Sequence, residues 1–206
     1  KAKNNTMMLS VANYQVADHN TSIFKQTNFS SNTGKTEVNF STSYMQLVPH
    51  IRQLLDGEII LDNVALEKPI IKAHLGSTVG SEKKDIPKIM ISSLKMNQPQ
   101  IDFSINDSTK TSFSWNGSLN PSAFLEIKEI NSTQTTHSKT TIRESRFHLS
   151  NFEFSSNGKI FSSKNGNIIA SLKNVELKAE KGQTIEWNGF LENLVAKNFI
   201  ADSINK

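Results

Sequence analysis

The sequence predicts a mainly β protein: a long, twisted antiparallel sheet, built as an open groove or half-barrel of repeated kinked strands, with one short helix near residues 45–56. Two observations predict this. Apolar residues alternate with Asn, Ser and Thr over most of the 206 residues. A short signature also recurs, consisting of an apolar residue, any residue, Asn or Ser, and then two apolar residues separated by one position. Its copies span residues 11–16, 61–66, 91–96, 149–154 and 172–177, with a weaker copy at 191–196.

Two of these copies match over a longer stretch when the chain is shifted by thirty positions. In each copy apolar and polar residues alternate, then one extra position intervenes at Asp62-Asn63 or Ser92-Ser93, and then the alternation resumes. The apolar side chains therefore change once from odd to even positions, which predicts a bulge or a tight turn at that point. Separate hairpins of a β-sandwich explain each copy but not the shared break. The shift lays Ile59, Leu61, Val64, Leu66, Pro69 and Ile71 onto Ile89, Ile91, Leu94, Met96, Pro99 and Ile101.

The first part of the chain is expected to form strands followed by the helix. Within residues 7–44 apolar residues alternate with polar ones, and residues 32–34 carry a turn signal between two strands. Between residues 44 and 56 the period changes, and Asp56-Gly57 supplies the expected glycine stop, with Pro49 in the first helical turn. The apolar residues on one face of this helix are Leu47, Val48, Ile51, Leu54 and Leu55. The two long repeats then follow as strands, divided by a mobile loop or linker at residues 76–86.

From residue 101 onward the pattern is strand after strand. Asn-Gly pairs at residues 116–117, 157–158, 165–166 and 188–189 predict type I′ hairpins, because both central positions of that turn need positive φ. An antiparallel meander follows from such hairpins. Residues 131–141 contain no apolar side chain, and we expect a loop in the first half, the alternative being a fully solvated edge strand.

Composition narrows the classes of function. The net charge of +4 comes from dispersed lysines, which does not favour nucleic-acid binding. No stretch of about 18 apolar residues is present to span a membrane as a helix, and there is no cysteine. The five histidines are scattered without metal-ligand spacing, and no nucleophile elbow or phosphate loop occurs. We therefore expect no enzyme activity, metal site or cofactor.

A sheet with one wet face and one apolar face is implied, because polar residues fill every second position. The apolar face needs a cover, which the helix, a second sheet or a bound lipid chain would supply. The alternative is that the same side chains form a sealed core. The candidate lipid-binding residues are Ile59, Leu61, Ile71, Ile89, Ile91, Ile101, Phe103, Phe113 and Trp115. A second hypothesis is an extracellular or surface β-sandwich module for binding or adhesion, which presents Trp115 and Trp187 to a glycan or a protein.

The stretch from Leu47 to Gly57, followed by Glu58 through Pro69 to Ile71, resembles the N-terminal segment of AsmA-like proteins. In that family a short helix ending in glycine leads into a strand, a kink, a second strand and a proline. The copy at residues 89–101 is similar to the repeats of the same superfamily.

This resemblance implies a periplasmic β-groove protein of a double-membraned bacterium, anchored in the inner membrane by an N-terminal helix. It implies phospholipid or another acyl-chain ligand as the partner, and a function in phospholipid transport or in outer-membrane homeostasis and assembly. Residues 1–206 are expected to be a single β domain, an excised periplasmic fragment that lacks the anchor. Its sheet edges would meet a partner strand or the remainder of the same chain.

Overall fold

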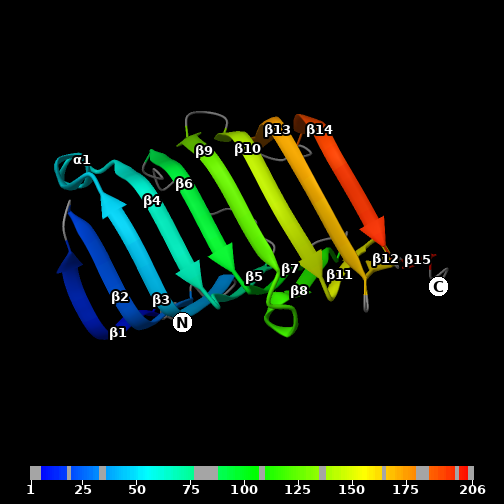
Figure 1. Cartoon of the computed structure of the whole chain (residues 1–206), viewed down its shortest axis with the longest axis horizontal. Helices are drawn as coiled ribbons and strands as arrows, with labels where there is room; N and C mark the ends of the chain where they lie inside the picture. The colour runs from blue at the N-terminus through cyan, green and yellow to red at the C-terminus, as the bar shows by residue number, and fades with distance from the viewer. Residues whose placement is uncertain are drawn as a thin grey trace, which may run out of the picture.

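The computed structural model describes residues 6–17, 20–32, 36–76, 88–106, 110–134, 138–163, 166–179, 186–197 and 200–203. They form one open sheet of fifteen strands with a short helix and one 3₁₀ turn (Figure 1). The first eight strands are β1 (Thr6–Ala17), β2 (Thr21–Asn32), β3 (Thr36–Pro49), β4 (Ile59–Glu67), β5 (Ile70–Gly76), β6 (Ile89–Asn97), β7 (Gln100–Asn106) and β8 (Ser112–Asn116). The others are β9 (Phe124–Gln134), β10 (Ser138–Ser150), β11 (Phe152–Ser156), β12 (Lys159–Ser162), β13 (Asn167–Ala179), β14 (Glu186–Lys197) and β15 (Ile200–Ser203).

The sheet is folded into two walls that share β3. The C-terminal half of β3 pairs with β4, whereas its N-terminal half pairs with β5. Wall A continues from β4 through β6, β9, β10 and β13 to β14, and wall B continues from β5 through β7, β8, β11 and β12 to β15. In Figure 1 the strands of wall A form the upper row and those of wall B lie below and behind them. The predicted open sheet of repeated kinked strands is confirmed.

The chain passes from one wall to the other along what we call the fold line, which consists of residues 68–69, 98–99, 117–123, 151, 163 and 166. Lys68, Gln98 and Asn151 have φ values of 50°, 50° and 52°, in the left-handed region. Pro69 and Pro99 follow the first two and are fully buried. Because a single left-handed residue turns an extended strand sharply, each long strand bends here and enters the other wall. The predicted proline kinks thus mark the boundary between the walls.

The two long repeats are neighbours in the sheet. Strand β4 pairs with β6, and β5 pairs with β7, at an offset of thirty residues that sets Ile59 beside Ile89 and Ile71 beside Ile101. Both pairings are parallel, whereas the sequence predicts an antiparallel sheet, so the sheet is mixed. The repeats cross the fold line in the same direction, and their equivalent residues therefore share one environment.

The predicted bulge is present in the first repeat. Leu47 of β3 lies opposite Val64, but Pro49 lies opposite Leu61, so Asp62 and Asn63 together face one residue of β3. A two-against-one arrangement of this kind is a β-bulge, and it flips the side-chain phase. In the later copy, Asn174 adopts φ 51° beside a register shift between β13 and β14. The signature's Asn therefore stands where the strand must re-aim its apolar side chains.

The helix is shorter than predicted. Helix α1 spans Ile51–Leu55, and Leu47, Val48 and Pro49 belong to β3. Pairing with β4 holds these three in the sheet and overrides their helical spacing. Gly57 ends the helix at φ 81°, as predicted. The apolar side chains of α1 are exposed, so the helix does not cover the apolar face of the sheet: Ile51, Leu54 and Leu55.

The predicted turns have mixed outcomes. Asn157 and Gly158, at φ 51° and 75°, join β11 to β12 as the expected hairpin. Gly117 instead begins the 3₁₀ turn η1 (Gly117–Leu119), and Gly189 lies inside β14. Asn165 and the loop at residues 77–86 lie outside the described residues. The loop expected from residue 131 is wrong as far as Gln134, because β6 and β10 flank β9 on both sides and satisfy its backbone.

Gly117 sits at a tight point of the fold line. A Cβ atom there would lie 2.9 Å from the backbone oxygen of Pro99 and 3.0 Å from Cβ of Ala123. We expect Gly117→Ala to lower the free energy of unfolding by about 1–3 kcal/mol, because a backbone contact cannot give way as a flexible side chain can. Chemical denaturation measures this, with the exposed Leu119→Ala as the control. An unchanged stability would contradict the close packing of η1 against Pro99.

Candidate functional site

An apolar cluster along the fold line shows which faces of the two walls look toward each other. Trp115, Ala123 and Phe152 are its buried members, and the first and last belong to wall B. Side chains from both walls pack against them: Ile101, Phe113, Leu125, Leu149 and Ile168. We call the face that carries this cluster the inner face, and the opposite face the outer face.

The inner face brings the predicted site residues together in cross-strand rows. In wall B, Ile71, Ile101 and Trp115 are successive partners, and Phe103 pairs with Phe113. In wall A, Ile59 pairs with Ile89, and Leu61 pairs with Ile91. Directly paired residues point to the same side of a sheet, so the thirty-residue repeat supplies apolar rows rather than isolated side chains.

Sequence reasoning missed inner-face residues that continue these rows across wall A. Leu66, Met96, Leu125 and Phe147 are successive partners on β4, β6, β9 and β10. Leu66 and Met96 are the last apolar positions of two signature copies, so following the alternation past the phase flip would have found them. Leu125 and Phe147 lie outside any copy and are identified only through their pairing.

The inner face is accessible rather than sealed. Among the described residues only seven hydrophobic side chains are buried. Trp115, which is 2% exposed, is the one predicted site residue among these seven. The other eight are half-buried. Phe154 and Phe161, which continue the Phe103 and Phe113 row, are 36% and 37% exposed. Trp115 therefore belongs to the core at the fold line, whereas its neighbours line an open surface.

The buried position of Trp115 also bears on the adhesion hypothesis. That hypothesis requires aromatic rings that lie exposed on the sheet, where a sugar can stack on them. Trp115 packs beside its cross-strand partner Phe152 at the fold line and is 2% exposed, so it presents no open ring face. The side chain of Trp187 lies outside the described part of the structure.

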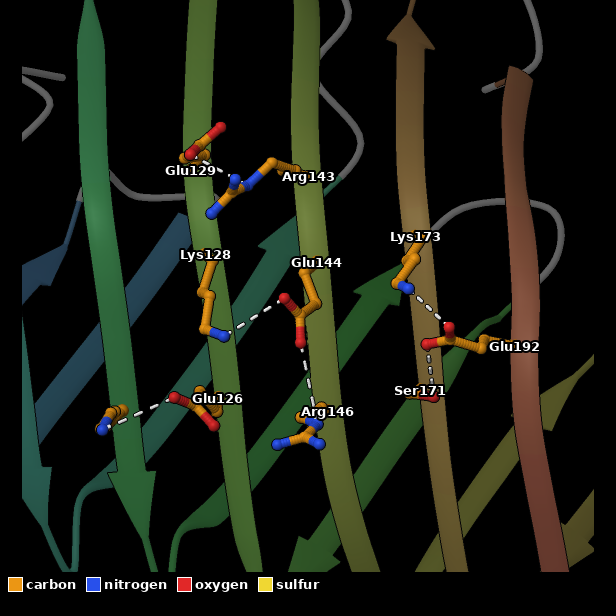
Figure 2. Close-up of polar contacts among 10 residues, drawn as sticks. Glu126, Lys128, Glu129, Arg143, Glu144, Arg146, Ser171, Lys173 and Glu192 are labelled. Atoms are coloured by element: carbon orange, nitrogen blue, oxygen red, sulfur yellow. Dashed lines mark hydrogen bonds and ion pairs between the residues drawn. The ribbon is translucent and has the colours of Figure 1, made fainter.

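The outer face of wall A carries a ladder of charged side chains on β6, β9, β10, β13 and β14 (Figure 2). Lys95 forms an ion pair with Glu126 at 3.5 Å, and Glu144 forms ion pairs with Lys128 at 3.2 Å and with Arg146 at 3.7 Å. In the figure these side chains lie in front of wall A, with wall B behind it. The wet and apolar faces predicted from the alternation are thus both present.

The end of this ladder gives a pH dependence. A hydrogen bond from Lys173 lowers the pKa of Glu192, and bonds from Lys178 and then Lys139 lower the pKa of Glu176. Glutamates with depressed pKa values stabilise the fold above their unfolded pKa, and that contribution is lost as the pH falls through the folded pKa. Acid should therefore lower the melting temperature modestly, because the groups are exposed. We expect Glu192→Gln to reduce the fall in melting temperature between pH 7 and pH 3. An unchanged fall would contradict a stabilising role for the Glu192 carboxylate.

Two hollows on the sheet are lined mainly by outer-face residues, and the lining of the smaller one also includes the inner-face residues Phe103 and Phe113. The larger, about 540 Å³, is lined by residues of β1, β2, β3 and β5, and the smaller, about 370 Å³, by residues of β3, β5, β7 and β8. Both include Asn39 and Lys72, which alternate with the inner-face residues Phe40 and Ile71 and so lie on the outer face. No group of three or more metal-ligating side chains occurs among the described residues.

Known family models and curated proteins give no match to this chain. Within the described residues, no helix has the length and apolar character needed to cross a membrane. The function must therefore be argued from the folded sheet and its two faces.

Proposed function

We propose that this protein carries lipid acyl chains on its inner face, as a non-enzymatic member of the AsmA-like class that acts in phospholipid transport or in outer-membrane homeostasis and assembly. The observation that carries the proposal is the open, folded sheet whose apolar rows remain half-exposed. Soluble proteins seldom leave large contiguous apolar surfaces open unless a ligand or partner covers them.

The energetics favour an acyl chain as that ligand. Moving one methylene from water onto an apolar surface is favourable by about 0.8 kcal/mol. The rows on the inner face have no polar interruption between Ile71, Ile101 and Trp115 or between Phe103 and Phe113. A chain lying across β5, β7 and β8 would exchange water for methylene and aromatic contacts, while its head group stayed at the open side in water.

The local geometry at the start of wall A supports the resemblance to AsmA-like proteins. A short helix ends at Gly57, a bulged strand follows, and a left-handed residue precedes Pro69 at the entry to the second strand. The second repeat reproduces the strand, the bend and the proline at Pro99. Location in the periplasm and attachment to an inner membrane through an N-terminal anchor are part of this proposal.

Lipid analysis of the purified protein tests the proposal. The protein should be expressed in a double-membraned bacterium, purified without detergent and extracted with organic solvent, and the extract should be analysed by mass spectrometry. We expect phospholipid in stoichiometric amounts with no strong head-group preference, because the inner face offers contacts to chains rather than to head groups. Protein that is free of lipid, and that takes up none from phospholipid vesicles, would contradict the proposal.

A further inference from the structure

Strand β1 forms one edge of the sheet. Among the described residues it pairs only with β2, so the backbone groups on its other side have no strand partner. Its side chains are open on both faces, with exposed fractions between 57% and 74% for the large apolar ones: Met7, Met8, Leu9, Tyr14 and Val16. An edge of this length with such side chains is a template for strand addition.

The sequence of β1 lacks the charges and prolines that usually block strand addition. Between Thr6 and Ala17 there is no charged residue and no proline. At the opposite end of the sheet, β14 carries Glu192 and Lys197. Because natural edge strands normally carry charges or prolines against unwanted pairing, a twelve-residue edge that has neither indicates a strand that pairs with a partner.

The apolar pattern of β1 is self-complementary. Val11 lies opposite Thr27 and Asn13 opposite Lys25, so Ala12 stands across from Gln26, which has φ 51°. The apolar side chains on the inner face of β1 change phase at this point, from Leu9 and Val11 to Tyr14 and Val16. If a second β1 pairs antiparallel about the Ala12–Asn13 bond, Val11 meets Tyr14 and Leu9 meets Val16 of the other copy. Polar Ser10 then meets Gln15, so these pairs on both sides of the axis match in character.

We propose that β1 is a dimerisation edge, at which two copies of this chain pair through antiparallel β1 strands related by a two-fold axis. The axis passes through the sheet between Ala12 and Asn13, where β1 changes phase, so the inner faces of the two copies lie on the same side. The result is one continuous folded sheet of thirty strands. An isologous contact of this type closes after two copies, and it does not depend on whether the inner face binds lipid.

Cysteine cross-linking tests the register, since the chain has no cysteine of its own. In the proposed pairing the two Ala12 residues are one position apart on adjacent strands, which are about 4.8 Å apart, and so lie within the range for a disulfide. Ala12→Cys should form a covalent dimer under mild oxidation. Met8→Cys is the control, because Met8 faces Ala17 of the other copy and the two Met8 residues lie far from each other. Equal cross-linking of both variants would overturn the proposed register.

Sedimentation velocity tests the dimer itself. We expect the wild-type protein to sediment as a dimer that dissociates on dilution. Asn13→Lys should sediment as a monomer, because it places two lysines side by side at the axis, whereas Thr6→Lys at the far end of β1 should remain dimeric. Both positions are exposed, so the fold tolerates lysine there. A wild-type protein that is monomeric at all concentrations, or an Asn13→Lys variant that dimerises like wild type, would overturn the proposal.

Discussion

Trp115→Ala is expected to lower the free energy of unfolding by about 3–5 kcal/mol, the usual cost of removing a large aromatic side chain from a packed interior. Trp115 is 2% exposed and is the largest member of the cluster that joins the walls at the fold line. Its removal leaves a cavity between Ile101, Ala123 and Phe152. Strand pairing holds Ile101 and Phe152, and backbone hydrogen bonds to Asn120 and Gln98 hold Ala123, so these residues cannot close in to fill it.

Urea unfolding followed by circular dichroism measures this loss. Phe190→Ala is the matched control, since Phe190 is an aromatic residue that is 70% exposed on β14 and its removal should change stability by no more than about 0.5 kcal/mol. If Trp115→Ala cost as little as Phe190→Ala, the walls would not be held together by this cluster.

Phe103→Lys is expected to abolish acyl-chain binding while leaving the fold intact. Phe103 lies half-buried in an inner-face row beside Phe113, and a lysine there places a charge where methylenes should lie. Desolvating that charge against an acyl chain costs several kcal/mol, which corresponds to a loss of binding of a hundredfold or more at roughly 1.4 kcal/mol per tenfold. Titration with a fluorescent fatty acid gives the dissociation constant.

Asp102→Lys is the matched control for Phe103→Lys. Asp102 is the preceding residue of β7, it is exposed, and it accepts a hydrogen bond from Ser114 at 2.8 Å on the outer face. The same lysine on that face should leave the dissociation constant within about twofold of the wild-type value, a difference of about 0.4 kcal/mol. Equal losses in the two variants would show that the inner face is not where the acyl chain binds.

The sequence predicted the repeated part of the fold well because its signals are local. The thirty-residue offset appears directly as the pairing of Ile59 with Ile89 and of Ile71 with Ile101, and Pro69 and Pro99 mark the bends. The parallel direction of this pairing was not predicted, because side-chain periodicity is the same in parallel and antiparallel strands.

Other features depended on partners that are distant in the sequence. The division of β3 between two walls depends on which strand lies beside each half, and no local pattern records this. Lys68 and Gln98 adopt positive φ, although lysine and glutamine seldom do. Their residue types therefore did not predict this backbone conformation. Among the site residues, Trp115 differs from its row partners Ile71 and Ile101 only in its depth at the fold line, which is a property of the assembled walls.

Photocross-linking at adjacent positions of β7 tests the central claim most directly. A benzophenone amino acid placed at Phe103 points to the inner face, and one placed at Ser104 points to the outer face, where Ser104 bonds His74 at 2.8 Å. Each variant is irradiated with phospholipid vesicles, and the lipid adducts are counted by mass spectrometry. We predict abundant acyl-chain adducts at position 103 and few at position 104. Adducts at neither position, or equally at both, would contradict an inner face that holds lipid chains.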